Sequence, residues 1–313
     1  MPDELPPAFL ERLARILPDA ALAHVRTPLA DDRPTWLRVN RLKTDPGALM
    51  RELAAEGIAA APVPGFDDAL QVPAAQRRAL TEAPAFHEGR CYIQGLSSQL
   101  AAPLLAPQPG ETVLDLAAAP GGKTLHLAVL MQNHGRLSAV EPVKERFFRL
   151  RANLERAGVT IARTYLMDGR AVGRKVPGRF DRVLLDAPCS SEARIRAGQP
   201  QSWAHWSERK IAEQSHKQRR LLLAGLEALR PGGRLLYCTC SFAPEENEGV
   251  LSHALRKRED VTLLPLELPV DNWQEGLTEW KGKPLDPRVR QARRILPNAR
   301  MDGFFLALLE KSG

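Results

Sequence analysis

The stretch TVLDLAAAPGGKT, at residues 112–124, decides the fold expected of this chain. Its first five residues form a short apolar run, which is typical of a strand buried within a parallel sheet. Small residues follow at once and open a helix, so the backbone at this turn can approach a ligand closely. A buried strand, a turn of small residues and a helix in succession predict the first unit of a doubly wound α/β sheet.

The same alternation of buried strand and helix continues along the chain. We expect strands at 112–116, 136–140, 162–167, 181–185 and 234–238, followed by 261–264 and 303–309. We expect helices near 123–132, 144–157, 207–229 and 246–256. This alternation is typical of a doubly wound, Rossmann-like parallel sheet.

A smaller mixed α/β module precedes this sheet. A helix at 7–17, a strand at 36–40 and a helix at 46–56 are separated by short loops rich in proline. We therefore expect an N-terminal α/β module at 1–90 and the doubly wound domain at 91–313.

Composition limits the classes of protein to which the chain can belong. Its 313 residues are 44% apolar, yet no apolar run approaches the roughly 20 residues of a membrane span. The charged start lacks the basic and apolar segments of a signal peptide, so we expect a cytoplasmic protein with no membrane partner. No two of the four cysteines are separated by two intervening residues, as in Cys-x-x-Cys. We therefore expect neither a disulfide framework nor a bound metal.

A formal net charge of +7 is consistent with a polyanionic partner. Basic residues gather near both ends of the chain, as Arg26, Arg33, Arg38, Arg41 and Lys43 and as Arg288, Arg290, Arg293, Arg294 and Arg300. A solvated surface explains such charge equally well. Clusters on both sides of a catalytic middle nevertheless favour a cradle for RNA.

The turn after the first strand is the expected cofactor site. It consists of Ala117, Ala118, Ala119, Pro120, Gly121, Gly122 and Lys123. Neither the Gly-x-Gly-x-x-Gly dinucleotide fingerprint nor the phosphate-binding Gly-x-x-x-x-Gly-Lys spacing is present. A turn without a pyrophosphate cradle suits a cofactor without phosphates, and we expect S-adenosylmethionine.

Acidic residues stand at or next to the ends of four consecutive strands, beginning with Asp115. Glu141 ends the second strand, where a carboxylate can accept hydrogen bonds from both ribose hydroxyls. Asp168 follows the third strand and could hold the adenine amino group, and Asp186 follows the fourth. Four such residues in sequence indicate a nucleoside-binding edge more specifically than any one of them.

Two cysteine segments predict the chemistry. They read DAPCS at 186–190 and YCTCS at 237–241, and each follows an apolar run that indicates a buried strand. Neighbouring parallel strands end at one edge of a sheet, so Cys189 and Cys240 should face the same crevice. One thiolate that attacks a ring and a second that removes a proton suit methylation of a pyrimidine carbon. The residues alone leave open which thiol attacks.

Together these segments resemble the RNA 5-methylcytosine methyltransferases of the Nop2/Sun (NSUN, RsmB/RsmF-like) family. The matching segments, in family order, are RVNRLK at 38–43, QGLSSQL at 94–100, APGGKT at 119–124, DAPCS at 186–190, TCS at 239–241, EENE at 245–248 and DGFF at 302–305. The resemblance implies a class I methyltransferase domain preceded by a small RRM-like RNA-binding module. It also implies methyl transfer from S-adenosylmethionine to cytosine C5 in RNA, with a small-subunit rRNA as the first expectation and a tRNA as the second. We expect a monomer.

The resemblance also assigns roles to the cysteines. It implies that Cys240 attacks cytosine C6 and that Cys189 removes the C5 proton, while Asp186 would stabilise the charge that addition develops. In DNA cytosine methyltransferases the cysteine of a Pro-Cys pair attacks, which would reverse the two thiols. Ser191 and Glu192 depart from the family pattern, in which glycine is usual, and this departure bears on loop geometry and substrate choice.

Two other functions remain open from sequence. A ribosome-assembly factor could keep the fold and the basic surface after losing catalysis, although this chain retains both cysteines and the whole cofactor edge. A small-molecule methyltransferase would need neither the N-terminal module nor the basic ends.

Overall fold

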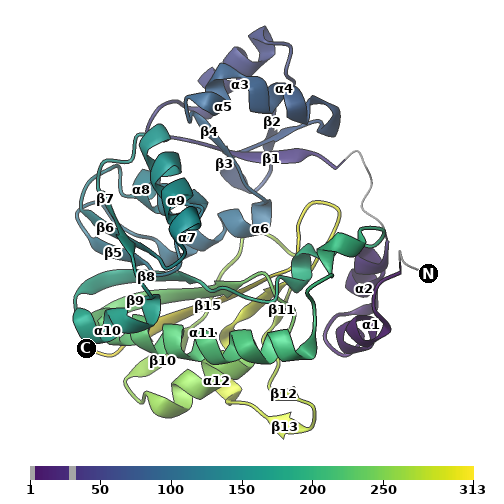
Figure 1. Cartoon of the computed structure of the whole chain (residues 1–313), viewed down its shortest axis with the longest axis vertical. Helices are drawn as coiled ribbons and strands as arrows, with labels where there is room; N and C mark the ends of the chain where they lie inside the picture. Colours follow the sequence, from purple (N-terminus) through teal and green to yellow (C-terminus); the bar gives the residue numbers. More distant parts are fainter. Residues whose placement is uncertain (1–3, 28–32) are drawn as a thin grey trace.

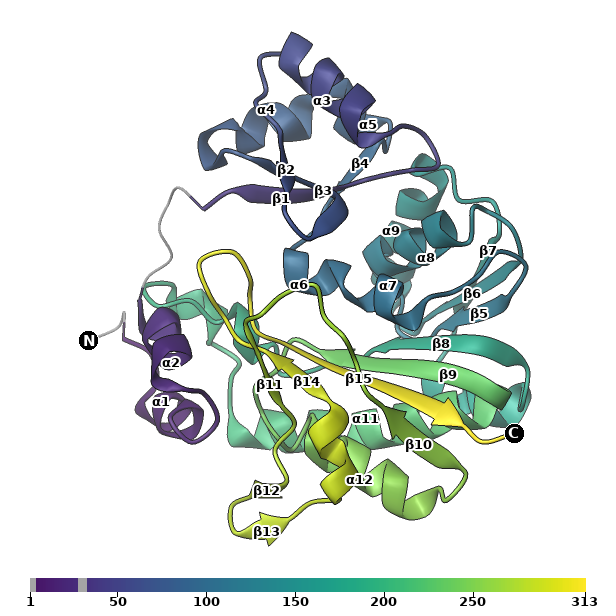
Figure 2. The same ribbon diagram turned by 180° about the vertical axis from the view of Figure 1, so that it is seen from behind.

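The computed structural model describes residues 4–27 and 33–313, which form a small sheet above a larger one (Figure 1). The reverse view shows the two N-terminal helices beside the larger unit, apart from the small sheet (Figure 2). No helix in these described ranges is long and apolar enough to cross a membrane.

The small unit follows a β-α-β-β-α-β path. Its elements are β1 (Thr35–Val39), α3 (Pro46–Ala55), β2 (Ala61–Val63), β3 (Phe66–Val72), η1 (Ala74–Gln76), α4 (Arg77–Glu82), α5 (Pro84–His87) and β4 (Cys91–Ile93). The strand order is β2-β3-β1-β4 and every pair is antiparallel. This arrangement confirms the predicted RRM-like fold. Strand β4 extends the small sheet past residue 90.

The two faces of the small sheet have different neighbours. Leu37 and Val39 of β1 pack against the helices of the small unit, in one buried cluster with Leu49 and Leu53. Trp36, which points to the opposite face, belongs to a cluster of the larger unit. RNA recognition modules use this open sheet face to stack bases. Here the larger unit covers it, so RNA contacts of the small unit would require another surface.

The N-terminal helices pack on the larger unit. Helices α1 (Pro7–Leu13) and α2 (Asp19–Arg26) share a buried cluster with Ile195 and Phe242. We predicted one helix over 7–17 and missed α2. The predicted helix ends at Leu13, and Pro18 is the N-cap residue of the next helix, where its ring fixes φ at −60°.

The larger unit contains a nine-stranded sheet. Its strands are β5 (Thr112–Asp115), β6 (Arg136–Glu141), β7 (Ala162–Leu166), β8 (Phe180–Asp186), β9 (Leu229–Thr239), β10 (Val261–Leu264), β11 (Trp273–Glu275), β14 (Arg293–Ile295) and β15 (Phe304–Lys311). The order is β11-β14-β15-β9-β8-β5-β6-β7, with β10 also paired to β15. Strands β7, β6, β5, β8 and β9 are parallel to one another, and the remaining pairs are antiparallel. The predicted doubly wound fold is confirmed.

Helices cover both faces of this sheet. They are α6 (Leu96–Gln99), α7 (Ala101–Leu105), α8 (Gly122–Leu130), α9 (Lys144–Arg156), α10 (Val172–Lys175), α11 (Glu208–Ala228) and α12 (Glu248–Lys257), with short 3-10 turns η2 (Gly169–Ala171), η3 (Glu192–Arg194), η4 (Pro200–Ser202) and η5 (Pro287–Gln291). Helices α7 to α9 lie on one face and α10 to α12 on the other (Figures 1 and 2).

The larger unit differs from the prediction in two places. Strand β9 begins at Leu229, because the predicted turn after α11 is an irregularity within the strand, where the pairing with β8 shifts register. We also missed β11 and β14 and the small β12 (Glu279–Trp280) and β13 (Lys283–Pro284) hairpin. These strands have two or three residues each, too few to show an alternating pattern.

The RVNRLK segment ties the two units together. Arg38 is 1% exposed and donates hydrogen bonds to the side chain of Gln94 and to the carbonyl of Gly122. Asn40 and Lys43 each donate to one carbonyl in the small unit and to another at the end of α9. The expectation that Arg38 contacts RNA phosphates is therefore wrong, because its guanidinium is buried.

Most of the other basic residues near the chain ends are also paired. Ion pairs join Arg33 to Asp302, Arg41 to Asp68, Arg288 to Asp286 and Arg290 to Glu275, and a buried one joins Arg294 to Glu248. The guanidinium of Arg293 lies 4.4 Å from the centre of the Trp273 ring. The predicted RNA cradle is wrong for Arg294, which is 3% exposed.

Replacing Arg38 with Ala should destabilise the protein by about 2 to 4 kcal/mol, because buried hydrogen-bond partners lose their donor and a cavity remains. Denaturant unfolding measures this loss. Arg41→Ala is the matched control, since Arg41 is exposed and its distance to Asp68 is 3.5 Å. Equal losses for both variants would contradict the buried role of Arg38.

Candidate active site

The two cysteine segments meet at the carboxyl edge of the large sheet. Strands β8 and β9 are parallel neighbours, and Asp186 lies opposite Cys238 in their register. Just beyond the strand ends, the Sγ atoms of Cys189 and Cys240 lie 3.3 Å apart. The structure thus brings together the two thiols that the sequence predicted to share one crevice.

This contact makes the two thiols unequal. The hydrogen bond with Cys189 lowers the pKa of Cys240 against the opposing effect of burial, and the charge of Arg194 lowers it further. The same hydrogen bond, together with burial, raises the pKa of Cys189 well above its ordinary value. Cys240 is therefore the thiol that ionises first, and the thiolate is the reactive form.

Arg194 is a site residue that we did not predict from the sequence. Its side chain is exposed and lines the same cavity as the two cysteines. A basic residue five positions after Cys189 was the available signal. The sequence does not show that this residue lies near Cys240, because that depends on the loop conformation. In the structure the neighbouring Ala193 N–H donates to the carbonyl of Cys240 at 3.0 Å.

A lysine orients the carboxylate of Asp186. The Nζ atom of Lys123 lies 2.7 Å from Asp186 Oδ2 and 2.6 Å from Ser98 Oγ. Burial acts to lower the pKa of Lys123, but the charge of Asp186 and neighbouring groups raise it overall. Cys238 is fully buried, with its Sγ 3.6 Å from Asp186 Oδ1. Asp186 is thus held in place by Lys123 beside the sulfur pair.

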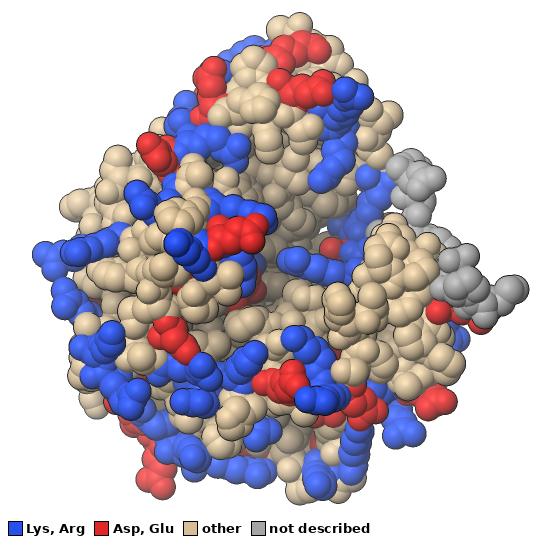
Figure 3. All heavy atoms as spheres, viewed as in Figure 1, with Lys and Arg blue, Asp and Glu red and all other residues tan. Residues whose placement is uncertain are grey.

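One cavity of about 620 Å³ connects the cysteines with the expected cofactor edge. Cys189, Cys240, Asp186, Glu141 and Asp168 all line it. Its volume lies within the range of about 300 to 1,000 Å³ that is typical of ligand sites. Its basic lining residues are Lys123, Arg146, Arg170, Arg194 and Lys217. Figure 3 shows a hollow between the small unit and the larger one, with Lys and Arg side chains at its border.

The small residues of the turn after β5 permit close packing. Gly121 has a φ of +108°, which side chains rarely adopt, and a Cβ on Gly122 would lie 2.6 Å from the ring of Tyr92. Ala117, Ala119, Pro120 and Lys123 line the main cavity, whereas Ala118 and Gly122 line a smaller adjoining one. Gly121 lines neither, so its part is to shape the turn.

The two acidic residues of the expected cofactor edge differ in their surroundings. Glu141 is 1% exposed, and its Oε1 accepts a hydrogen bond from the Val143 N–H at 2.9 Å. Its Oε2 is 3.6 Å from Arg146, which leaves room for ligand hydroxyl groups. The carboxylate of Asp168 is half-exposed and already pairs with Arg170. Both fit a nucleoside without phosphates, and Asp168 would exchange part of its pairing for the ligand.

Asp115 supports this edge from below. It is 1% exposed, and its Oδ2 accepts a hydrogen bond from Thr124 Oγ1 at 2.7 Å, which joins the end of β5 to α8. Its other oxygen has no hydrogen-bond partner among the described residues. Burial raises the pKa of Asp115 to about 7. Asp115 therefore fixes the turn and does not reach the main cavity.

The fold and the sulfur pair define a class I methyltransferase, and comparison with known proteins identifies the family. Residues 102–310 match the family described as 16S rRNA methyltransferase RsmB/F, and residues 5–77 match the ferredoxin-like domain of RsmF/B-like methyltransferases. The chain belongs to this RsmB/F family.

Several relatives carry names that describe an activity. A human 28S rRNA (cytosine(4447)-C(5))-methyltransferase is 38% identical over 97% of this chain and 37% of its own length. Ribosomal RNA small subunit methyltransferase F from Vibrio vulnificus strain YJ016 is 35% identical over 98% of this chain and 64% of its own length. A tRNA (cytosine(49)-C(5))-methyltransferase from Pyrococcus abyssi is 41% identical over 71% of each. The chain thus spans less than half the length of the eukaryotic relatives it matches.

Solved structures agree with the fold. A methyltransferase homologue from Pyrococcus horikoshii is 34% identical, with a TM-score of 0.78 over 98% of this chain and all of the other. NSun6 from Pyrococcus horikoshii, solved with SFG, is 23% identical, with a TM-score of 0.82 over the whole of both chains, and it supports the fold.

Replacing Asp115 with Asn should flatten the pH dependence of stability between about pH 4 and 7. The folded state holds the Asp115 proton more tightly than the unfolded state, because burial raises its pKa to about 7. This contribution is present at acid pH and is lost as the pH rises through 7, at most about 4 kcal/mol. Unfolding free energies of both proteins across this range test it, and parallel curves would contradict it.

Proposed function

We propose that this protein transfers a methyl group from S-adenosylmethionine to C5 of a cytosine in RNA. The observation that carries the proposal is the sulfur pair, with Sγ atoms 3.3 Å apart, in one cavity with Glu141 and Asp168. The names of the human and Pyrococcus abyssi relatives support cytosine C5 as the acceptor, and the name of the Vibrio relative supports methylation of ribosomal RNA.

Four groups would hold the cofactor. Glu141 would accept hydrogen bonds from the ribose hydroxyls, Asp168 would bind the adenine amino group, and the turn at 117–123 would pack against the nucleoside, with Asp186 beside it. Bound there, S-adenosylmethionine would supply the methyl group. That NSun6 was solved with SFG, a S-adenosylmethionine analogue, supports this assignment.

Cys240 would be the nucleophile. Cytosine C5 reacts poorly with an electrophile until a thiolate adds to C6, which gives C5 enamine character. In the proposed step a bond forms between Cys240 Sγ and C6 while the C5–C6 double bond opens and N3 takes up a proton from solvent, and Asp186 stabilises the adduct by accepting a hydrogen bond from this N3–H. The lowered pKa of Cys240 supports this assignment over the reverse one, because its thiolate is available at lower pH.

Cys189 would complete the reaction. After the methyl group reaches C5, that carbon carries both a methyl group and a proton. Once Cys240 is bonded to C6, it no longer carries the thiolate that raises the pKa of Cys189. Cys189 could then lose its proton to solvent and, as thiolate, accept the C5 proton, and the electron pair of the C5–H bond would expel Cys240 from C6 and restore the aromatic ring.

The RNA is proposed to be a small-subunit rRNA. The RsmF relative, which is aligned over 98% of this chain, supports this choice. The Pyrococcus abyssi relative, aligned over 71% of both chains, supports a tRNA as the second candidate. The target cytosine would be unpaired or flipped, because neither thiol can reach C6 within a duplex.

The wider proposal concerns location and binding surface. We propose a monomer that acts in the cytoplasm, with the small unit, which extends through β4 to residue 93, as an RNA-binding module and the larger unit as the catalytic domain. Basic residues at the cavity border, including Arg194 and Lys217, would contact RNA phosphates.

Transfer of tritium from methyl-labelled S-adenosylmethionine tests the function, with small-subunit rRNA, tRNA and free cytidine as acceptors. Bisulfite sequencing then locates the modified cytosine. Label in free cytidine alone would indicate a small-molecule enzyme. No label in any of the three would contradict these acceptors, and RNA binding without transfer to any RNA would indicate a binding factor.

Replacing Glu141 with Ala should weaken cofactor binding by about 1 to 3 kcal/mol, the effect of losing a hydrogen bond to a charged group. Calorimetry with S-adenosylmethionine measures it. Glu145→Ala is the control, since Glu145 is exposed on α9 and pairs only with Arg149 among the described residues. Unchanged affinity of a folded Glu141 variant would refute the ribose role.

The two cysteine variants should accumulate different species. Cys189→Ala should attack and methylate once, then remain bound, because the base that releases the product is missing. Denaturing electrophoresis with labelled RNA should therefore show a covalent protein–RNA band for Cys189→Ala. Cys240→Ala should show none. The opposite pattern would assign the attack to Cys189.

A further inference from the structure

Two buried glutamates cross between the cysteine loops. Glu246 follows Cys240 in the chain, yet its carboxylate accepts hydrogen bonds from the N–H of Ser190, at 2.9 and 3.2 Å, and from the Ser190 hydroxyl. Glu192 follows Cys189, yet its Oε2 accepts hydrogen bonds from groups that follow Cys240. These donors are Ser241 Oγ and the Phe242 N–H, each at 3.1 Å.

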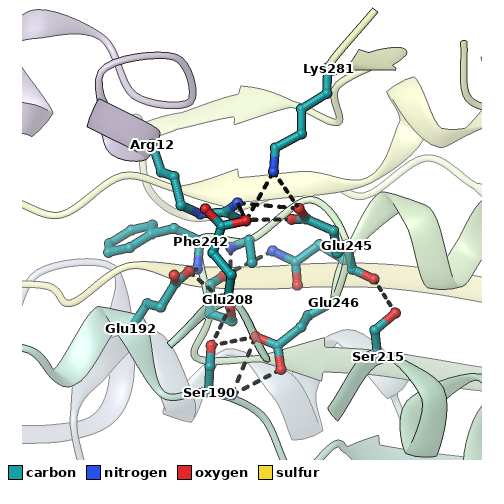
Figure 4. Close-up of polar contacts among 12 residues, drawn as sticks. Arg12, Ser190, Glu192, Glu208, Ser215, Phe242, Glu245, Glu246 and Lys281 are labelled. Carbon is teal, nitrogen blue, oxygen red and sulfur yellow. Dashed lines mark hydrogen bonds and ion pairs between the residues drawn. The ribbon is translucent and has the colours of Figure 1, made fainter. Parts of the chain in front are cut away.

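Each loop supplies a glutamate that accepts hydrogen bonds from the other loop, and a contact between two serines lies between the glutamates. Ser190 comes directly after Cys189 and Ser241 directly after Cys240, and their Oγ atoms lie 3.0 Å apart. Figure 4 shows the Glu246 carboxylate beside Ser190, joined to it by dashed lines, and Glu192 near Phe242. Each cysteine loop therefore carries the acceptor for hydrogen bonds donated by the other loop.

We propose that Glu192 and Glu246 are positioning residues that hold the Cys189 and Cys240 loops in register. We call the side chains of Glu192, Glu246, Ser190 and Ser241 the clasp. This inference rests on the proposed function only for its effect on the rate of methylation.

The clasp is anchored to the rigid part of the fold. Gln218 of α11 donates to Glu246 Oε1 at 3.1 Å and to the carbonyl of Pro188 at 2.9 Å. The Tyr237 hydroxyl of β9 donates to the carbonyl of Glu246 at 2.5 Å. The indole N–H of Trp206 donates to Glu192 Oε1 at 2.9 Å. Each carboxylate is thus fixed from outside the two loops as well as between them.

Stability alone does not account for two such carboxylates. Glu192 is 1% exposed and Glu246 is fully buried, and in the described residues neither forms an ion pair with Lys or Arg within 4.0 Å. Burial raises the pKa of both, that of Glu246 to about 7. Burying two carboxyl groups costs free energy, whereas two apolar side chains at these positions would not have this cost. We therefore infer that the hydrogen bonds of Glu192 and Glu246 have a role besides stability.

The clasp acts through the loops and not on the substrate. Cys189, Ser191 and Cys240 line the active-site cavity, whereas neither Glu192 nor Glu246 does. Ser191 has a φ of +61°, in the left-handed region, and its Oγ lies 3.6 Å from Cys240 Sγ. The clasp therefore accounts for a loop conformation that places both sulfurs in contact.

The experiment measures how readily the two sulfurs meet. Diamide oxidises two thiols that can approach each other to a disulfide, so the rate of closure between Cys189 and Cys240 reports their relative placement. Cys91 and Cys238 are 2% and 0% exposed and should stay reduced. Peptide mass spectrometry follows closure in wild type, Glu192→Gln, Glu246→Gln and the control Glu245→Gln. Glu245 is adjacent to the clasp in sequence, but its carboxylate contacts Arg12.

We expect closure to be about tenfold slower in each clasp variant, because the amide replaces a carboxylate oxygen that accepts from the other loop by an NH2 group that cannot accept. Closure should be unchanged in Glu245→Gln. The double variant Ser190→Ala/Glu246→Gln should slow closure by less than the product of the two single effects. Both substitutions remove the same contact, the hydrogen bond from the Ser190 hydroxyl to the Glu246 carboxylate. Closure rates in both clasp variants that equal the control would overturn the proposal. If Glu246→Gln does not fold, Ser190→Ala alone decides, with slow closure supporting the clasp and normal closure overturning it.

A second readout links the clasp to catalysis. The kcat for RNA methylation should fall in the clasp variants, with the KM for RNA and the cofactor Kd unchanged. Closure requires neither RNA nor cofactor. Slow closure in variants of a protein whose wild type transfers no methyl group would overturn the proposed function and leave the clasp supported.

Discussion

The parallel pairing of β8 with β9 is the constraint on which the site depends. The register that places Asp186 opposite Cys238 brings the two strand ends to the same level, so that the following residues meet. A shift of one residue would turn each side chain of a strand to the other face. The buried apolar residues of both strands fix this register, because Val183 and Leu185 share one hydrophobic cluster with Leu235 and Tyr237.

Electrostatic asymmetry then distinguishes two chemically identical groups. The thiols share a hydrogen bond, but Arg194 lies on the side that favours ionisation of Cys240, while Glu246 acts to raise the pKa of Cys189. Lys123 neutralises Asp186 beside them. One thiolate and one thiol can therefore coexist at 3.3 Å, where two thiolates would repel each other.

The parallel strands and the meeting of the cysteines could be predicted from sequence because they depend on local apolar runs and on one topological rule. The roles of Arg38 and Arg294 could not, since each depends on a partner far away in the chain, Gly122 for Arg38 and Glu248 for Arg294. Charge alone suggested phosphate contacts for both. The clasp was also hidden, because an isolated Glu192 gives no signal of a partner at Ser241.

The order in which the two thiols ionise tests the central claim most directly. Alkylation of the free protein with iodoacetamide, followed across pH by peptide mass spectrometry, gives the pKa of each cysteine separately. We predict that Cys240 reacts first, with a midpoint below the ordinary thiol value, and that Cys189 stays unmodified until much higher pH. Earlier reaction of Cys189, or equal midpoints for the two thiols, would contradict the account.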